Sequence, residues 1–271
     1  MKDLTKLYTK ADIHSQLRAM GAPRTSIVLM HSAYRLVGNV EGGICGFLDA
    51  MIEYFTAEGG LFCVPTHTWG FLSREVTLDL TAPETCLGAI SELAAKDPRG
   101  IHSQNPTHSM VVFGDRNRAE AFIKDETRIT SCTSPDSAYG KLYREGGSVL
   151  LVGVAHNKNT YLHCVEEMLN VPNRLSPEAH RTTVKLTTGE LVERKLHTHY
   201  TDFTSDVSLR FPKYETAFRY HGAIRDGFLG NAPTQLCDAR VMKDVMERIR
   251  KNSDGKELLA DERAIPQTLY R

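Results

Sequence analysis

Residues 149–167, VLLVGVAHNKNTYLHCVEE, predict a buried strand, a short polar loop and the first turns of a helix. The apolar run 149–154 is too short for a globular helix and is rich in β-branched residues. Two glycines precede the run and a polar loop follows it, which is typical of a strand covered on both faces. Asn159 or Thr160 can cap the following helix, so the stretch predicts a strand–loop–helix unit of an α/β protein.

His163 and Glu166 lie three residues apart on this predicted helix and therefore share one face. The pair follows a predicted parallel strand, and α/β proteins tend to place their chemistry beyond the carboxyl ends of such strands. Taken alone, the pair fits two roles. It is a structural histidine held by a local acid, the commoner case, or a general base oriented by a carboxylate. Glu167, four residues after His163, competes as the partner acid.

The rest of the chain predicts an α/β fold with a mostly parallel central sheet flanked by helices. Strands alternate with helices over residues 1–170, the pattern of a parallel sheet. Residues 171–271 predict a smaller, partly antiparallel C-terminal α+β subdomain, packed on the core as one functional unit. The predicted core strands are 26–30, 61–64, 110–113 and 149–154, the core helices are 9–20, 44–57, 85–96 and 116–124, and the C-terminal elements are a hairpin at 183–196, strands at 223–229 and 234–237 and a helix at 238–250.

Polar segments adjoin four predicted strands, at residues 31–43, 65–69, 102–109 and 156–167. Because loops at one edge of an α/β sheet lie close together, we expect these segments to converge on one cleft. The first segment contains several glycines but matches neither a GxGxxG motif nor a P-loop. Its free amides suit a phosphorylated or amide-bearing ligand, and its glycines equally suit an ordinary turn.

The composition of the 271 residues predicts an ordinary globular protein of the cytoplasm. With 33 basic and 33 acidic residues the formal net charge is zero, so neither nucleic acid nor an anionic membrane is an expected partner. No apolar run approaches the length of a membrane span, and residues 1–5 lack the apolar core of a signal peptide. The six cysteines form no CxxC pair, which favours reduced thiols.

Two other kinds of site are weighed against the His163–Glu166 pair. Cys164 is a candidate nucleophile, but adjacent helical residues point about 100° apart, so His163 cannot readily serve as its base. A buried thiol is the favoured interpretation of Cys164. The chain has many histidines, but none falls in a zinc-type spacing such as HExxH, so no metal is predicted.

Seven segments, taken in order, resemble the aminoglycoside 3-N-acetyltransferase family, also called antibiotic N-acetyltransferases. Each segment is weakly specific alone, but their order is specific and covers nearly the whole chain. The segments are 28–33 running to Gly42-Gly43, 64–69 (VPTHTW), 87–89 (LGA), 105–109 (NPTHS), 136–142 (DSAYGKL) leading into 149–153, 159–167 (NTYLHCVEE), and the late pair 230–232 and 237–240.

This resemblance implies an enzyme that transfers an acetyl group from acetyl-CoA to an amine of an aminoglycoside by direct attack. It implies that His163 is the general base and Glu166 its orienting partner. The expected partners are CoA and a small-molecule amine, with a homodimer possible. The resemblance places the main-chain cradle for CoA at Ser32, Ala33, Tyr34, Arg35, Leu36 and Val37, with Ser103, Thr107 and Ser109 on the donor side.

Three departures from the family pattern concern the acceptor more than the fold. Asn105 stands where the family often has histidine, and Ala138 stands where it has proline. A neutral chain is unusual for an enzyme that binds polycations, although Asp79, Asp136, Asp202 and Asp206 can still form a local acidic wall. The alternatives are an acyltransferase of the same fold that acts on another amine, and a non-catalytic CoA-binding relative.

Overall fold

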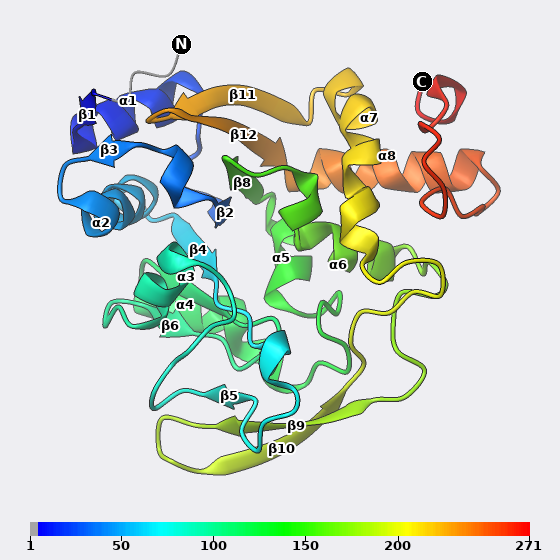
Figure 1. Ribbon diagram of the computed structural model, residues 1–271, viewed down its shortest axis with the longest axis horizontal. Helices are drawn as coiled ribbons and strands as arrows, with labels where there is room; N and C mark the ends of the chain where they lie inside the picture. The colour runs from blue at the N-terminus through cyan, green and yellow to red at the C-terminus, as the bar shows by residue number, and fades with distance from the viewer. Residues whose placement is uncertain (1–4) are drawn as a thin grey trace.

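A seven-stranded sheet with helices on both faces forms the body of the protein, as the computed structural model of residues 5–271 shows (Figure 1). The prediction that the N-terminus lacks a signal-peptide core concerns mainly residues 1–4, which lie outside the described residues. The strand order is β11-β12-β8-β2-β4-β7-β6. The strands span Ile27–Ser32 (β2), Leu61–Pro65 (β4), Ile101–His102 (β6), Met110–Phe113 (β7), Ser148–Val152 (β8), Ile224–Leu229 (β11) and Ala232–Asp238 (β12).

The sheet is mixed rather than mostly parallel, which corrects the predicted fold class. Two pairings of this sheet are parallel, those of the central strand β2 with β4 and with β8. The other four pairings, β4–β7, β7–β6, β8–β12 and β12–β11, are antiparallel. A buried strand shows the same apolar run in either orientation, so hydrophobic pattern alone does not fix its direction. The predicted α/β class with a helix-flanked central sheet is confirmed.

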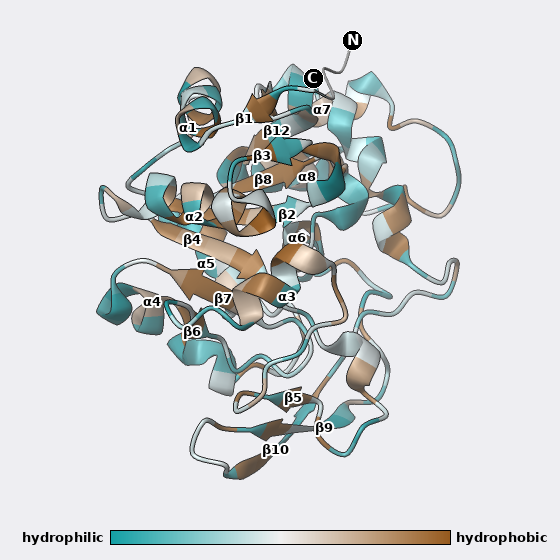
Figure 2. Ribbon diagram, turned by 60° about the vertical axis from the view of Figure 1, so that its left-hand side comes forward, coloured by the Kyte–Doolittle hydropathy of each residue, from teal (hydrophilic) through white to brown (hydrophobic). Residues whose placement is uncertain are grey.

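Two apolar cores form because side chains alternate between the faces of the sheet. In β2, Ile27 and Leu29 pack into one core, and Val28 and Met30 pack into the other. The hydropathy colours show the apolar central strands enclosed by these layers (Figure 2). Helices α4 (Arg116–Ile123), α5 (Ala138–Glu145), α6 (Tyr161–Met168), α7 (Glu215–Tyr220) and α8 (Ala239–Asn252) contribute to the first core, and α1 (Lys10–Ala19), α2 (Gly43–Thr56) and α3 (Ala89–Ala95) contribute to the second.

Residues of the predicted C-terminal subdomain contribute strands to the central sheet, and the predicted boundary at residue 170 stays a prediction. Strand β12 pairs with β8, so the β11–β12 hairpin extends the central sheet itself. Helix α8 packs against α5 and α6. The physical reason is that β8 would otherwise be an exposed sheet edge.

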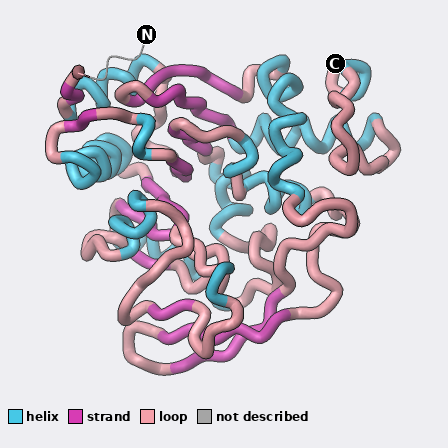
Figure 3. Tube along the Cα trace, in the orientation of Figure 1, coloured by secondary structure: helices cyan, strands magenta, loops and turns pink. Residues whose placement is uncertain are grey.

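A small separate sheet combines residues from both sides of that boundary. Its strands β5 (Leu78–Asp79), β9 (His180–Lys185) and β10 (Leu191–Leu196) have the order β10-β9-β5, with β5 parallel to β9. It lies away from the central sheet, joined to it by long loops (Figure 3). A third sheet pairs β1 (Leu7–Tyr8) with β3 (Asn39–Val40). Among residues 5–271, no helix has the length and apolar character needed to cross a membrane.

Candidate active site

The loops beyond β2, β4 and β8 meet the start of β7 at one edge of the sheet. The Ala33 amide donates to the Val152 carbonyl at 2.8 Å, which joins the loop after β2 to the end of β8. The Thr66 amide donates to the Ser109 carbonyl at 2.9 Å, which joins the loop after β4 to the segment before β7. These bonds bring polar segments together in two pairs at this edge, and the single cleft expected there stays a prediction.

His163 and Glu166 face each other on α6, which begins directly beyond this edge. The imidazole Nδ1 of His163 lies 4.0 Å from Oε2 of Glu166, and their side chains are 11% and 1% exposed. Glu167 faces elsewhere, because its carboxylate accepts hydrogen bonds from the hydroxyls of Ser131 and Thr133. Glu166 is thus the acid beside the imidazole, and the competition between the two acids is resolved.

Neither of the two residues expected to cap α6 does so with its side chain. Thr160 occupies the N-cap position but makes no side-chain capping bond. Asn159 is turned toward His156, with its Nδ2 3.1 Å from Nδ1 of that imidazole. The first turn of α6 is instead held by packing, since Tyr161 and Leu162 are fully buried.

Burial sets the protonation states of the pair. It lowers the pKa of His163 well below 6.5, and the neighbouring His199 and Arg174 act in the same direction. Burial also raises the pKa of Glu166 to about 7, although the Arg174 guanidinium opposes the rise. At neutral pH the imidazole is therefore neutral, which is the form that can accept a proton.

The raised pKa of Glu166 predicts a pH-dependent contribution to stability. In the unfolded chain this carboxyl ionises near 4.5, whereas in the folded protein it ionises near 7. The folded state holds the proton more tightly, so this contribution is complete below pH 4.5 and is lost as the pH rises through 7. Its size is about 3 kcal/mol.

Glu166→Gln cannot ionise, so we expect it to flatten the dependence of the unfolding free energy on pH between 4.5 and 7. Urea unfolding at pH 5, 6, 7 and 8 measures this, and the difference from wild type isolates the one carboxyl. Glu190→Gln, exposed in the β9–β10 turn, is the matched control. If the unfolding free energies of the wild type and of Glu166→Gln change with pH in parallel, the raised pKa assigned to Glu166 is wrong.

A row of imidazoles continues from His163 into the site. His199 stacks on His163 with ring centroids 3.8 Å apart and an interplanar angle of 18°. His108 meets His199 edge to face at 4.8 Å, and His67 lies 4.6 Å from His108. The ring of Phe211 lies edge to face with His163, with centroids 4.8 Å apart. His163 therefore sits in a wall of aromatic rings.

Hydrogen bonds fix several of these rings. The Tyr139 hydroxyl donates to the His108 carbonyl at 3.1 Å, so it accepts from Nε2 of His67 at 2.9 Å. Burial raises the pKa of the Cys132 thiol well above 9, and the thiol lies 3.3 Å from Nε2 of His199. A protonated thiol donates to that nitrogen, which leaves the proton of the neutral ring on Nδ1.

The sequence predicted no metal because its histidines have no zinc-type spacing. In the structure, three possible metal ligands from distant parts of the sequence lie close together. Among residues 5–271, one group of three histidine, cysteine or acidic side chains has donor atoms within 4.8 Å of one another: His108, Cys132 and His199. Two of these donors already bond to each other, and Nδ1 of His108 lies 3.0 Å from the Thr107 hydroxyl. We therefore treat the group as part of the hydrogen-bonded wall.

The predicted CoA cradle forms a tight turn after β2. Ser32 ends the strand, and Tyr34–Leu36 form a single 3₁₀ turn, η1, in which Arg35 is exposed. Val37 is fully buried, and its carbonyl accepts from the Asn231 amide at 2.7 Å. The amides of Ala33, Leu36 and Val37 all donate to backbone carbonyls. The turn is thus held by backbone hydrogen bonds on both sides, with Arg35 exposed and Tyr34 and Leu36 packed against the core.

The three predicted donor-side hydroxyls are buried and engaged within the protein. Ser103 accepts from the Met110 amide at 3.1 Å, and Ser109 donates to the Thr66 carbonyl at 2.7 Å. Thr107 bonds the His108 ring, as described above. Thr107 and Ser109 therefore border the site, whereas Ser103 closes the β6–β7 turn. A contact with CoA from any of them stays a prediction.

The four aspartates suggested as an acidic wall have separate surroundings. Asp79 pairs with Lys185 in the small sheet at 3.1 Å. Asp202 accepts from Asn173 at 3.2 Å, and Asp206 caps the 3₁₀ helix η5 (Val207–Tyr214). Burial lowers the pKa of His199 to about 4, and the charge of Asp206 opposes this. Of the four, Asp206 is the one whose charge acts on the imidazole row.

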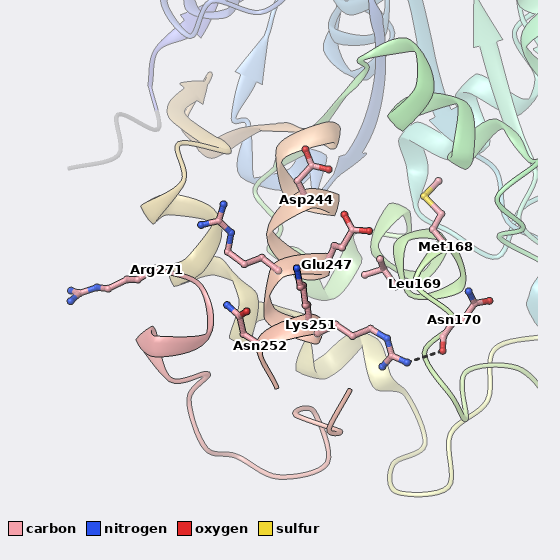
Figure 4. A pocket seen from close by; sticks show the side chains of 10 residues that line it. Met168, Leu169, Asn170, Asp244, Glu247, Lys251, Asn252 and Arg271 are labelled. Carbon is pink, nitrogen blue, oxygen red and sulfur yellow. Dashed lines mark hydrogen bonds between the residues drawn. The ribbon is translucent and has the colours of Figure 1, made fainter. Parts of the chain in front are cut away.

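One surface groove lies away from these residues, at the carboxyl end of α6. It has a volume of about 930 Å³ and lies between that end, α8 and the last residue of the chain (Figure 4). Its lining mixes acids such as Asp244 with bases such as Lys251, and it contains none of the predicted site residues. His163, in the first turn of α6, faces the sheet edge instead.

Residues 29–250 match the model of one protein family, described as aminoglycoside 3-N-acetyltransferase. The chain therefore belongs to the aminoglycoside 3-N-acetyltransferase family, a family of acyltransferases. The resemblance predicted from the sequence motifs is confirmed. One similar protein is aminoglycoside N(3)-acetyltransferase IV of a Salmonella species, 31% identical over 166 residues. That alignment spans 61% of this chain and 61% of the relative.

Solved structures share the fold across almost the whole chain. A histidine-to-alanine mutant of AAC(3)-IVa, in complex with a gentamicin, has a TM-score of 0.76 at 24% identity and covers 93% of this chain and 92% of its own. AAC-IIIb in binary complex with CoASH has a TM-score of 0.74 at 20% identity, covering 88% and 94%. At these identities the likeness establishes the fold.

Proposed function

We propose that the protein is an acetyl-CoA-dependent N-acetyltransferase that acylates an amine of an aminoglycoside, with His163 as general base and Glu166 as its partner. The observation that carries the proposal is the buried His163–Glu166 pair at the edge of the sheet where polar loops meet in pairs. Family membership supports the reaction class, and the names of similar structures support both ligands, since they mention CoASH and gentamicin. We place the reaction in the cytoplasm.

The chemistry removes two protons from the acceptor nitrogen, because an ammonium group with three N–H bonds becomes an amide with one. At neutral pH an aminoglycoside amine is mostly an ammonium and has no free electron pair. The neutral imidazole of His163 takes one proton, and the amine then attacks the thioester carbonyl. A C–N bond forms and the C–S bond breaks. The nitrogen loses its second proton as the departing CoA thiolate gains one, and the imidazolium then releases its proton to solvent. Glu166 stabilises the imidazolium that exists between these steps.

The turn at Ser32–Val37 is the proposed main-chain cradle for CoA. Among the described residues, the amides of Tyr34 and Arg35 have no backbone partner, so they are available to donate to phosphate or amide oxygens of the cofactor. Ser103, Thr107 and Ser109 support the donor side by holding the loop before β7 in place. This division puts the donor beside β2 and the base at the start of α6.

Release of free CoA thiol, measured with acetyl-CoA and a panel of amines, tests the proposal. We expect turnover with aminoglycosides and little with simple primary amines such as ethanolamine. The neutral overall charge supports one alternative, an acyltransferase for a less cationic amine, which predicts the opposite ranking. Binding of acetyl-CoA without transfer to any amine would indicate a non-catalytic relative and would overturn the proposal.

A further inference from the structure

Behind Glu166 lies an arginine that sequence motifs did not single out. Nε of Arg174 donates to Oε1 of Glu166 at 2.6 Å, and Nη2 donates to Oε2 of Glu257 at 2.7 Å. The Arg174 side chain is 4% exposed, whereas Glu257 is 30% exposed. The groups therefore form a line from the surface to the base: Glu257, Arg174, Glu166 and His163.

The two oxygens of Glu166 have different surroundings. Oε1 is held by Arg174, but Oε2 is buried without a hydrogen-bond partner among the described residues. It is Oε2 that faces Nδ1 of His163 at 4.0 Å. A buried carboxylate oxygen without a partner is costly, so its orientation has to be imposed by the groups that hold the other oxygen.

Arg174 is itself held rigidly. Its Nη1 donates to the carbonyls of Pro172 and Asn173 at 3.3 and 3.2 Å, and the guanidinium lies 5.4 Å from the Phe203 ring centroid. Glu257 is fixed in turn, because its Oε1 accepts from the Leu259 amide at 2.6 Å. The planar guanidinium, with its forked donors, bonds both carboxylates at once.

We propose that Arg174 is a positioning residue for the general base: it fixes Oε1 of Glu166 so that Oε2 stays aimed at His163, and its positive charge favours the ionised form of this carboxyl. The inference rests on the proposed function, since it concerns the same base. Burial of Glu166 favours the neutral acid, and a neutral acid cannot stabilise an imidazolium. Arg174 supplies the opposing charge.

The other charged and titratable groups around the pair do not replace Arg174. Around His163 they are the imidazoles of the wall, and around Glu166 the nearby acids disfavour its charge. Removing Arg174 therefore makes Glu166 harder to ionise and His163 easier to protonate, and both changes require a higher pH for the active form. The groups concerned are His67, His108 and His199 around His163, and Glu167, Tyr214 and Glu257 around Glu166.

Arg174→Gln and Arg174→Lys test this in the full-length protein. We expect Arg174→Gln to lower kcat by about 10- to 100-fold, with KM for the acceptor amine changed by less than about threefold, and to move the acid limb of the kcat/KM profile to higher pH. Arg174→Lys keeps the charge but not the fork, so it should restore the pH profile and only part of kcat. Arg219, exposed between Glu215 and Asp226, provides the matched control Arg219→Gln.

The outcomes separate this inference from the proposed function. An inactive His163→Asn variant together with a folded Arg174→Gln variant of unchanged kcat and pH profile overturns the role of Arg174 alone. Full turnover by His163→Asn overturns the base assignment, whatever Arg174 does. If Arg174→Gln does not fold, the Arg174→Lys variant decides: wild-type kcat would overturn the inference, and a reduced kcat with a wild-type acid limb supports it.

Discussion

Replacing His163 with asparagine is expected to lower kcat by about a hundred- to ten-thousandfold, the usual contribution of a positioned general base. Asparagine occupies similar space but cannot accept a proton from an ammonium. The substitution lies outside the proposed CoA cradle at residues 32–37, so CoA should bind with unchanged affinity. Thiol release at saturating acetyl-CoA measures turnover, and calorimetric titration with CoA measures donor binding.

The neighbour of His163 on α6 supplies a control for that experiment. Cys164 is fully buried, and burial raises the pKa of its thiol well above 9, so it is a poor nucleophile. Cys164→Ala should therefore keep kcat within about threefold of wild type. If Cys164→Ala were inactive and His163→Asn active, the direct-attack mechanism would give way to an acyl-enzyme on Cys164.

Gly140→Ala is expected to destabilise the fold by about 3 kcal/mol, near the upper end of overpacking effects. A Cβ atom added at Gly140 would lie 1.7 Å from the Pro135 carbonyl oxygen, which is backbone and cannot rotate away. To relieve the clash, α5 must move from the loop 131–137. That loop carries Cys132, and α5 carries Tyr139, which bonds His67.

Urea unfolding measures the effect, with Gly88→Ala as the matched control. Gly88 precedes α3, and an added Cβ there meets nothing within 4 Å. We expect that variant to lose less than about 1 kcal/mol. Equal losses of unfolding free energy in Gly140→Ala and Gly88→Ala would show that the clash at Gly140 has no effect on stability.

The elements that local pattern defines were predictable. The run 149–154 predicted β8, and Thr9 predicted the start of α1, where its side chain accepts from the Asp12 amide in a capping box. The spacing of His163 and Glu166 placed them on one helical face, because helix geometry is local. Local sequence pattern does not show whether His163 is a general base, so the family motifs were needed to favour that role.

What the sequence did not predict depends on pairing between distant segments. His199 reaches His163 only because residues 197–199 bridge to Ser131 on one side and Leu175 on the other. Arg174 and Glu257 lie in loops of no distinctive composition. The antiparallel direction of β7 and β12 is set by how the chain returns to the sheet. The cue available for Arg174 was physical: a buried carboxylate such as Glu166 needs a cationic partner.

The hydrogen bond between Arg174 and Glu257 connects Glu166 to a segment that is synthesised much later. During synthesis His163 and Glu166 leave the ribosome well before Glu257 does. Until the segment around Leu259 docks beside η5, where Lys213 donates to the Leu258 carbonyl, Arg174 lacks one of its two carboxylates. A nascent chain can therefore pair the strands of its central sheet before the contact between Arg174 and Glu257 is made.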